Sequence, residues 1–169
     1  MKIQRATIHD LNEIAALSRE VWVANFTCFL SEAQIDYMLS RSYTPEAMQH
    51  DIENRESTYI KAVVDHQMIG YAAYRPAGPT GRLLLDKIYV HPTHQHHGYG
   101  YQLFQHVEKK AMEAGYFDIV LYVSQFNTAA VTTYATWGFE IAGSKEENIG
   151  KNFVIHDYIM KRELDFMTG

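Results

Sequence analysis

The chain has 169 residues, of which 47% are hydrophobic and 21% charged, and its formal net charge is −5 at pH 7. This length is sufficient for a sizeable core, so we expect one domain spanning residues 1–169. The negative charge and the lack of an arginine-rich run argue against a nucleic-acid partner held by electrostatic attraction. Cys28, the one cysteine, excludes an internal disulfide framework and favours a reducing compartment.

The sequence also argues against a membrane partner. Residues 1–5 lack the apolar centre of a signal peptide, and no run approaches the ~20 apolar residues that a membrane span needs. We therefore expect a cytoplasmic protein.

Hydrophobic patterns divide the chain into strands and helices. Strands are predicted at residues 2–6, 58–64, 68–74, 83–90, 119–123, 139–142 and 153–160, with a polar link at 144–152. Helices are predicted at residues 11–22, 31–39, from 44 onward, 103–111 and 127–137, where apolar side chains recur at helical spacing. Because antiparallel strands come first and a β-α-β unit later, the order predicts a mixed α/β (α+β) sheet with helices on both faces.

The turn after the strand at residues 83–90 carries the strongest chemical signal. The strand stops at Pro92, because proline has no amide to extend a ladder, and Gly98 and Gly100 precede the next helix. The first amides of a helix lack partners within it, its dipole is positive there, and glycine lets a ligand approach the backbone closely. This turn is therefore suited to bind an anion such as a phosphate.

Two common phosphate-binding motifs do not fit this turn. The dinucleotide-binding motif G-x-G-x-x-G requires a third glycine where this chain has Leu103. The nucleoside-triphosphate loop requires a lysine followed by serine or threonine after its glycines, whereas Gly100 is followed by Tyr101 and Gln102.

The turn instead resembles the central motif of the GNAT superfamily of acetyl-CoA-dependent N-acyltransferases, Q/R-x-x-G-x-G/A after a strand ending in V-x-P. The matching residues are Val90, Pro92, Gln95, Gly98 and Gly100. A second family block, N-x-x-A-x-x-x-Y-x-x-x-G-F, follows in order at Asn127, Ala130, Tyr134, Gly138 and Phe139. The resemblance implies a GNAT-like fold, with a central, mostly antiparallel sheet of six or seven strands flanked by helices on both faces.

The resemblance also implies that acetyl-CoA is the co-substrate. It puts the pyrophosphate of CoA on the amides of the glycine turn, and the pantetheine arm along the backbone of Ile88 and Val90 like an added strand. Asn127 either caps its helix or contacts the pantetheine amide. The implied cofactor-binding residues are Ile88, Val90, Gln95, His96, His97, Gly98, Tyr99, Gly100, Tyr101 and Asn127.

Catalytic roles are implied for two residues. Tyr134 matches the family tyrosine that donates a proton to the departing thiolate, although it could instead be an aromatic packing residue. A phenol with a pKa near ~10 suits a thiolate whose conjugate acid has a pKa of ~8.5. Relatives that acetylate protein α-amines have a glutamate where this chain has Tyr122. Asp86 is the best remaining carboxylate for a base, acting directly or through water, unless it is a surface residue or an ion-pair partner.

Histidines surround the glycine turn. His91, His94, His96 and His97 would bind a metal only if their side chains converged, and no cysteine or carboxylate has suitable spacing, so no metal is expected. Many relatives have a basic residue around this turn. If His96 and His97 contact the pyrophosphate, affinity for CoA should fall as the pH rises through roughly 6 to 8. The alternative is that both rings face solvent.

The sequence is compatible with three functions. The first is an acetyl-CoA-dependent N-acetyltransferase that acts on a small primary amine or polyamine by direct attack in a ternary complex. Residues 22–45 are similar to the bacterial polyamine acetyltransferase branch, and Glu32 and Asp36 would attract a cation there unless they are only a solvated helix face. The others are acetylation of a protein α-amine or lysine, and a CoA-binding regulatory module without turnover. A homodimer is compatible with each.

Overall fold

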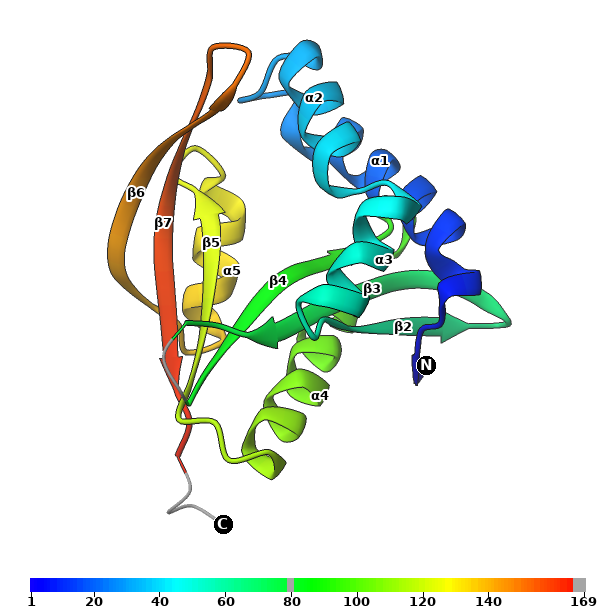
Figure 1. Ribbon diagram of the computed structural model, residues 1–169. Helices are drawn as coiled ribbons and strands as arrows, with labels where there is room; N and C mark the ends of the chain where they lie inside the picture. The colour runs from blue at the N-terminus through cyan, green and yellow to red at the C-terminus, as the bar shows by residue number, and fades with distance from the viewer. Residues whose placement is uncertain (79–80, 166–169) are drawn as a thin grey trace.

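The strands of the chain form one seven-stranded sheet in the order β1-β2-β3-β4-β5-β7-β6. A computed structural model describes residues 1–78 and 81–165 (Figure 1). The strands are β1 Lys2–Arg5, β2 Thr58–Val64, β3 Gln67–Pro76, β4 Arg82–Val90, β5 Asp118–Ser124, β6 Glu140–Gly150 and β7 Phe153–Glu163. Neighbours pair antiparallel except β4 and β5, which are parallel. The predicted mixed, mostly antiparallel sheet is confirmed.

Helices cover both faces of this sheet (Figure 1). They are α1 Leu11–Phe26, α2 Glu32–Ser42, α3 Pro45–Asn54, α4 Tyr99–Glu113 and α5 Thr128–Thr136, with short 3-10 turns at Ile8–Asp10 and Pro92–His94. Successive residues of β2 and β3 face different cores, because side chains alternate along a strand. Tyr59 and Tyr71 pack with α1 and α3, whereas Ile60 and Ala72 pack with α4. None of the described helices is long and apolar enough to cross a membrane.

The parallel pairing between β4 and β5 is short. It consists of three residue pairs and ends at Leu84 and Val120. Beyond these residues β4 continues to Val90 against β3, and β5 continues to Ser124 against β7. The two strands therefore diverge, and one edge of β4 over residues 85–90 has no partner among the described strands. The opening lies where α4 and α5 begin.

The carboxyl-terminal hairpin corrects one prediction. The sequence predicts a polar link at residues 144–152, but β6 runs from Glu140 to Gly150 and joins β7 through a turn at Lys151 and Asn152. Both turn residues have positive φ, as a type I′ hairpin turn requires. The prediction is wrong because β6 is a largely exposed edge strand, so its sequence lacks the regular alternation of a half-buried strand.

Candidate active site

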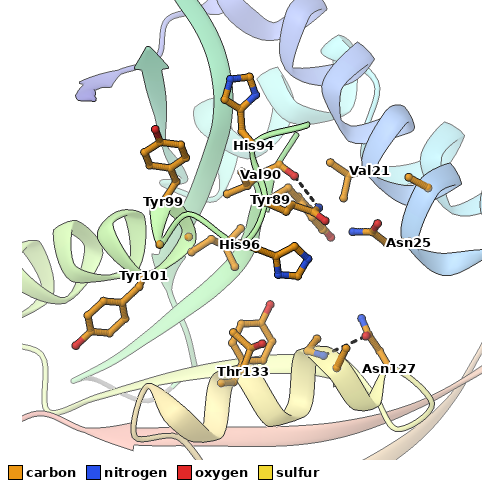
Figure 2. Close-up of a pocket in the computed structure, with 18 of the residues that line it drawn as sticks. Val21, Asn25, Tyr89, Val90, His94, His96, Tyr99, Tyr101, Asn127 and Thr133 are labelled. Atoms are coloured by element: carbon orange, nitrogen blue, oxygen red, sulfur yellow. Dashed lines mark hydrogen bonds between the residues drawn. The ribbon is translucent and has the colours of Figure 1, made fainter. Parts of the chain in front are cut away.

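A cleft of about 640 Å³ lies between α1, the end of β4, the start of α4 and α5. We call it the turn cleft, and Figure 2 shows the side chains around it. Of the predicted cofactor-binding residues, it is lined by Ile88, Val90, Gln95, His96, Gly98, Tyr99, Gly100, Tyr101 and Asn127. Tyr134 lines it as well, whereas His97 and Asp86 do not. Most of the residues of the two sequence motifs thus meet in one cleft.

The turn between β4 and α4 presents free backbone amides to this cleft. Gly98 is the N-cap of α4 with a φ of +81°, a left-handed conformation that favours glycine, and it supplies no side-chain cap. The amides of the first helical turn, from Tyr99 to Tyr101, have no partner within the helix. Gln95 Nε2 donates a hydrogen bond to the carbonyl oxygen of Val90 at 2.9 Å and so ties the turn to the end of β4. The turn can therefore bind an anion through the backbone amides at the start of α4.

The structure separates the two histidines that the sequence treats as a pair. The ring of His96 projects into the turn cleft (Figure 2), and its φ is +67°. The ring of His97 stacks on Tyr99, and its Nδ1 lies 2.7 Å from the carbonyl oxygen of Gln95. Of these two rings, only that of His96 is therefore positioned to meet a ligand in the cleft, which His94 lines as well.

The other histidines of the turn are engaged locally. His91 bonds to Glu20 of α1 and to Thr93, and His94 bonds to the same threonine hydroxyl. Within residues 1–78 and 81–165, no group of three or more His, Cys, Asp or Glu side chains could hold a metal ion.

Tyr134 lies on α5 at the inner end of the turn cleft. Its ring packs edge-on against Trp137 and Phe139, which fixes its position. Its hydroxyl makes no hydrogen bond to any residue that the structure describes. Burial raises the pKa of Tyr134 to about 12, because desolvation disfavours the phenolate. The side chain is thus both an aromatic packing residue and a protonated hydroxyl that is free to contact a ligand.

Asn127 caps the neighbouring helix. Its Oδ1 accepts a hydrogen bond from the amide of Ala130 at 3.2 Å, which confirms the capping role that the sequence suggests. Its side chain also lines the turn cleft (Figure 2). The side-chain NH₂ group can still donate to a ligand there.

A second cavity, of about 310 Å³, lies on the other side of Tyr134. We call it the aromatic cavity. Its aromatic lining consists of Trp22, Phe26, Phe29, Tyr43, Tyr89, Tyr122, Phe126 and Tyr134. It shares Phe26, Tyr89, Asn127 and Tyr134 with the turn cleft. Two ligands, one in each space, would therefore both contact this shared wall, which includes Tyr134.

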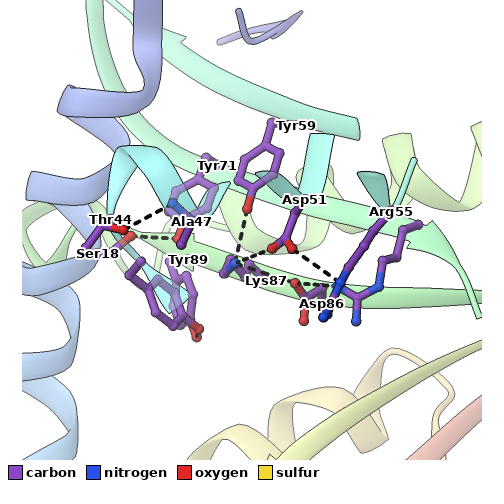
Figure 3. Close-up of polar contacts among 12 residues, drawn as sticks. Ser18, Thr44, Ala47, Asp51, Arg55, Tyr59, Tyr71, Asp86, Lys87 and Tyr89 are labelled. Carbon is purple, nitrogen blue, oxygen red and sulfur yellow. Dashed lines mark hydrogen bonds and ion pairs between the residues drawn. The ribbon is translucent and has the colours of Figure 1, made fainter. Parts of the chain in front are cut away.

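Asp86 lines the aromatic cavity and belongs to a network of charges (Figure 3). Its carboxylate lies 3.3 Å from Arg75 Nη1 and 3.5 Å from Lys87 Nζ. Lys87 is buried, and its ammonium also contacts the hydroxyl of Tyr59 at 3.1 Å and Asp51 at 3.9 Å. Asp86 is thus an ion-pair partner of two cations, which is one of the alternatives to a catalytic base that the sequence leaves open.

The sequence did not predict one residue of the site, and it suggested two others that lie outside the site. Asp157 of β7 lines the aromatic cavity, but nothing in its sequence context distinguishes it from other strand carboxylates. Glu32 and Asp36 line neither the turn cleft nor the aromatic cavity, and Asp36 is ion-paired with Arg19 at 2.9 Å. Those two carboxylates form a solvated helix face.

Comparison with known proteins agrees with this geometry. The sequence pattern of the acetyltransferase (GNAT) family matches residues 18–139. The spermidine N(1)-acetyltransferase of Thermoplasma acidophilum is 24% identical over 159 residues, which cover 92% of this chain and 95% of that protein.

Solved structures show the same fold. The PaiA N-acetyltransferase of Thermoplasma acidophilum in complex with coenzyme A has a TM-score of 0.80 and 22% identity, over 96% of this chain and 98% of that one. A GCN5-related N-acetyltransferase from Rhodopseudomonas palustris has a TM-score of 0.81 and 18% identity, over 96% and 95% of the two chains. The chain belongs to the GNAT family of acetyltransferases. It is an acetyl-CoA-dependent N-acetyltransferase.

The glycine turn gives a first prediction. Gly98→Val should weaken CoA binding roughly 100-fold or more, because its side chain would fill the cleft and each lost charge-assisted hydrogen bond contributes ~1.5–3 kcal/mol. Gly115→Val is the matched control: Gly115 has a φ of +84° and open space around it, but it follows α4 outside the turn cleft. Both variants carry similar backbone strain. Calorimetric titration that finds native affinity in folded Gly98→Val would mean that CoA binds elsewhere.

The two histidines give a second prediction. The imidazole of His96 can donate a hydrogen bond to a pyrophosphate oxygen, so His96→Ala should weaken CoA binding roughly 10-fold or more, since a hydrogen bond to a charged group contributes ~1.5–3 kcal/mol. His97→Ala should leave the affinity unchanged, because its ring stacks outside the cleft. Calorimetric titration measures both affinities. Equal dissociation constants for the native protein and His96→Ala would exclude a phosphate contact by His96.

Proposed function

We propose that this N-acetyltransferase acetylates the primary amine of a small molecule, with a polyamine as the first candidate, by direct attack in a ternary complex. The observation that carries the proposal is the pair of spaces that meet at Tyr134. One offers phosphate-binding amides and an open strand edge, and the other offers aromatic walls with carboxylates.

The donor would occupy the turn cleft. Its pyrophosphate would accept hydrogen bonds from the amides between His96 and Tyr101, at the positive end of the α4 dipole. Its pantetheine arm would pair with the free edge of β4 near Ile88 and Val90, in the manner of an added strand. This path leads from the turn toward Tyr134, and so brings the thioester to the boundary with the aromatic cavity.

The acceptor would occupy the aromatic cavity. A volume of about 310 Å³ suits a small molecule and is at the lower end of ordinary ligand sites, which span ~300–1,000 Å³. Aromatic faces attract ammonium groups by cation–π interaction, and Asp86 and Asp157 add negative charge. The spermidine N(1)-acetyltransferase among the relatives supports a polyamine as the acceptor.

Tyr134 would serve as the general acid. As the neutral amine attacks the thioester carbonyl carbon, a C–N bond forms, the C–S bond breaks, and the thiolate takes the phenolic proton. The nitrogen of the new amide then loses a proton, which restores the phenol of Tyr134. The raised pKa of Tyr134 keeps the phenol protonated at neutral pH. Burial in the same cleft also raises the pKa of the conjugate acid of the thiolate, since desolvation disfavours any anion. Burial therefore raises both the pKa of Tyr134 and the pKa of the CoA thiol.

Asp86, which the sequence predicts as the base, would contact the amine from the aromatic cavity, directly or through water. Its ion pairs with Arg75 and Lys87 hold its carboxylate in place. Because it already contacts two cations, Asp86 is better suited to attract and orient the acceptor than to take its proton.

The substrate class is tested by thiol release from acetyl-CoA with an amine panel. The panel contains spermidine, simple monoamines, a peptide with a free α-amine and a lysine peptide. We expect the highest kcat/KM with a small amine. A preference for either peptide would favour a protein acetyltransferase, and CoA binding without thiol release would favour a regulatory module.

Replacement of Tyr134 by phenylalanine tests the acid. Tyr134→Phe should lower kcat about 10- to 1000-fold and leave CoA affinity within a few-fold, because it removes general-acid assistance and keeps the ring. Since activity needs the protonated phenol and its pKa is about 12, Tyr134 should cause no alkaline loss of kcat below pH ~10. Unchanged turnover in Tyr134→Phe, with chemistry shown to be rate-limiting, would remove Tyr134 from the mechanism.

A further inference from the structure

Asp157 of β7 has an unusual position for a carboxylate. Its side chain lines the aromatic cavity and also an adjoining space of about 380 Å³, which we call the charged cavity. It is mostly withdrawn from solvent, yet no described residue reaches its carboxylate with a hydrogen bond or an ion pair. The backbone of Asp157 is held separately, by a hydrogen bond from Gln125 Nε2 to its carbonyl oxygen. The described residues thus leave the carboxylate of Asp157 without a bonded partner.

The other carboxylates of the two cavities all have cationic partners. Asp86 contacts Arg75 and Lys87, Asp51 contacts Lys87 and Arg55, and Glu147 contacts Lys145 at 3.6 Å. A buried carboxylate without a partner is costly, because its charge loses the stabilisation of water. Asp157 is thus the carboxylate of this site that a cationic ligand would stabilise most.

Asp157 also lies on the face of the sheet that lines the aromatic cavity. It pairs with Ser124 of β5 and with Lys145 of β6, so these side chains share its face. Tyr122 lies two residues before Ser124 on the same face, and Ser124 precedes the short loop to Asn127, the cap of α5. Asp157 and Tyr134 therefore line the same cavity from different walls.

We propose that Asp157 binds the ammonium group of the acceptor in the aromatic cavity and takes its proton before attack on the thioester. This role rests on the proposed function. The ammonium transfers one proton to the carboxylate of Asp157, and the neutral amine attacks the carbonyl carbon of acetyl-CoA. The C–S bond breaks and the thiolate takes the proton of Tyr134. The phenolate that remains takes the second proton from the nitrogen of the new amide, which restores the phenol.

The surroundings of Asp157 suit proton uptake. Burial raises the pKa of Asp157, and Glu147 raises it further, whereas Lys145 and His156 oppose this shift. A carboxylate with a raised pKa is a better base near neutral pH than an ordinary aspartate. The opposite walls of the two cavities contribute the charged groups Arg41, Asp51, Arg55, Arg75, Asp86 and Lys87. Most of these are paired with one another, so Lys145 and His156 are the positive groups that act on Asp157.

Activity of Asp157→Asn tests the role directly. With the best amine of the panel, kcat/KM should fall ~10²–10⁴-fold, and CoA affinity should stay within a few-fold of native. The acidic limb of the kcat/KM profile should disappear, because activity of the native protein rises as the pH passes the pKa of Asp157. Asp65→Asn, in the exposed turn between β2 and β3, is the control and should retain native rates.

A stability measurement gives a readout that does not depend on turnover. Because the folded-state pKa of Asp157 is raised above its unfolded value, the native protein should lose stability as the pH rises through the folded pKa. Asp157→Asn should therefore have a higher Tm than the native protein at neutral pH. The difference should vanish in acid, where the native carboxyl is protonated as well.

The outcomes separate this role from the proposed function. A native protein that acetylates no amine contradicts the proposed function, and with it the role of Asp157. An active native protein with an equally active Asp157→Asn variant contradicts only the role of Asp157. If Asp86→Asn removes the acidic limb and Asp157→Asn keeps it, then Asp86 is the base and the assignment of Asp157 is wrong.

Discussion

The geometry of this site depends on the early end of one strand pairing. β4 and β5 are joined by three parallel residue pairs, and beyond Leu84 each strand keeps a partner on one side only. An open strand edge has backbone groups without hydrogen bonds, which is unfavourable unless water or a ligand supplies them. The same divergence leaves space for a cofactor within the sheet and directs the amino-terminal end of α4 at that space. Fold and function are thus linked by an interruption in the sheet.

Burial then gives the two sides of the opening different chemistry. It raises the pKa of Tyr134, which keeps a proton available for a departing thiolate, and it raises the pKa of Asp157, which makes this carboxylate a better proton acceptor. Tyr89 lines both spaces, and its hydroxyl is hydrogen-bonded to the hydroxyl of Tyr43 at 2.7 Å. One physical effect, desolvation, therefore supports both the acid and the base that we propose for a single acetyl transfer.

The sequence predicts the donor side well because its determinants are local. Gly98 and Gly100 lie in one turn, and Tyr134 follows Asn127 at a fixed helical spacing, so a short motif specifies their geometry. The acceptor side depends on strands far apart in the chain. Asp157 meets the aromatic cavity only because β7 inserts between β5 and β6, and His97 leaves the cleft only because its ring stacks on Tyr99. No local pattern encodes such contacts, and the exposed β6 likewise lacks a clear strand signal.

In the arrangement that we propose, the opening between β4 and β5 brings the sulfur of CoA to the hydroxyl of Tyr134. A crystal structure with CoA bound would show whether it does. We expect a pyrophosphate on the amides that follow His96, a pantetheine arm along the edge of β4, and a thiol within hydrogen-bond reach of Tyr134 Oη, with the aromatic cavity still open beyond it. A bound CoA whose thiol lies away from Tyr134, or whose arm fills the aromatic cavity, would rule this arrangement out.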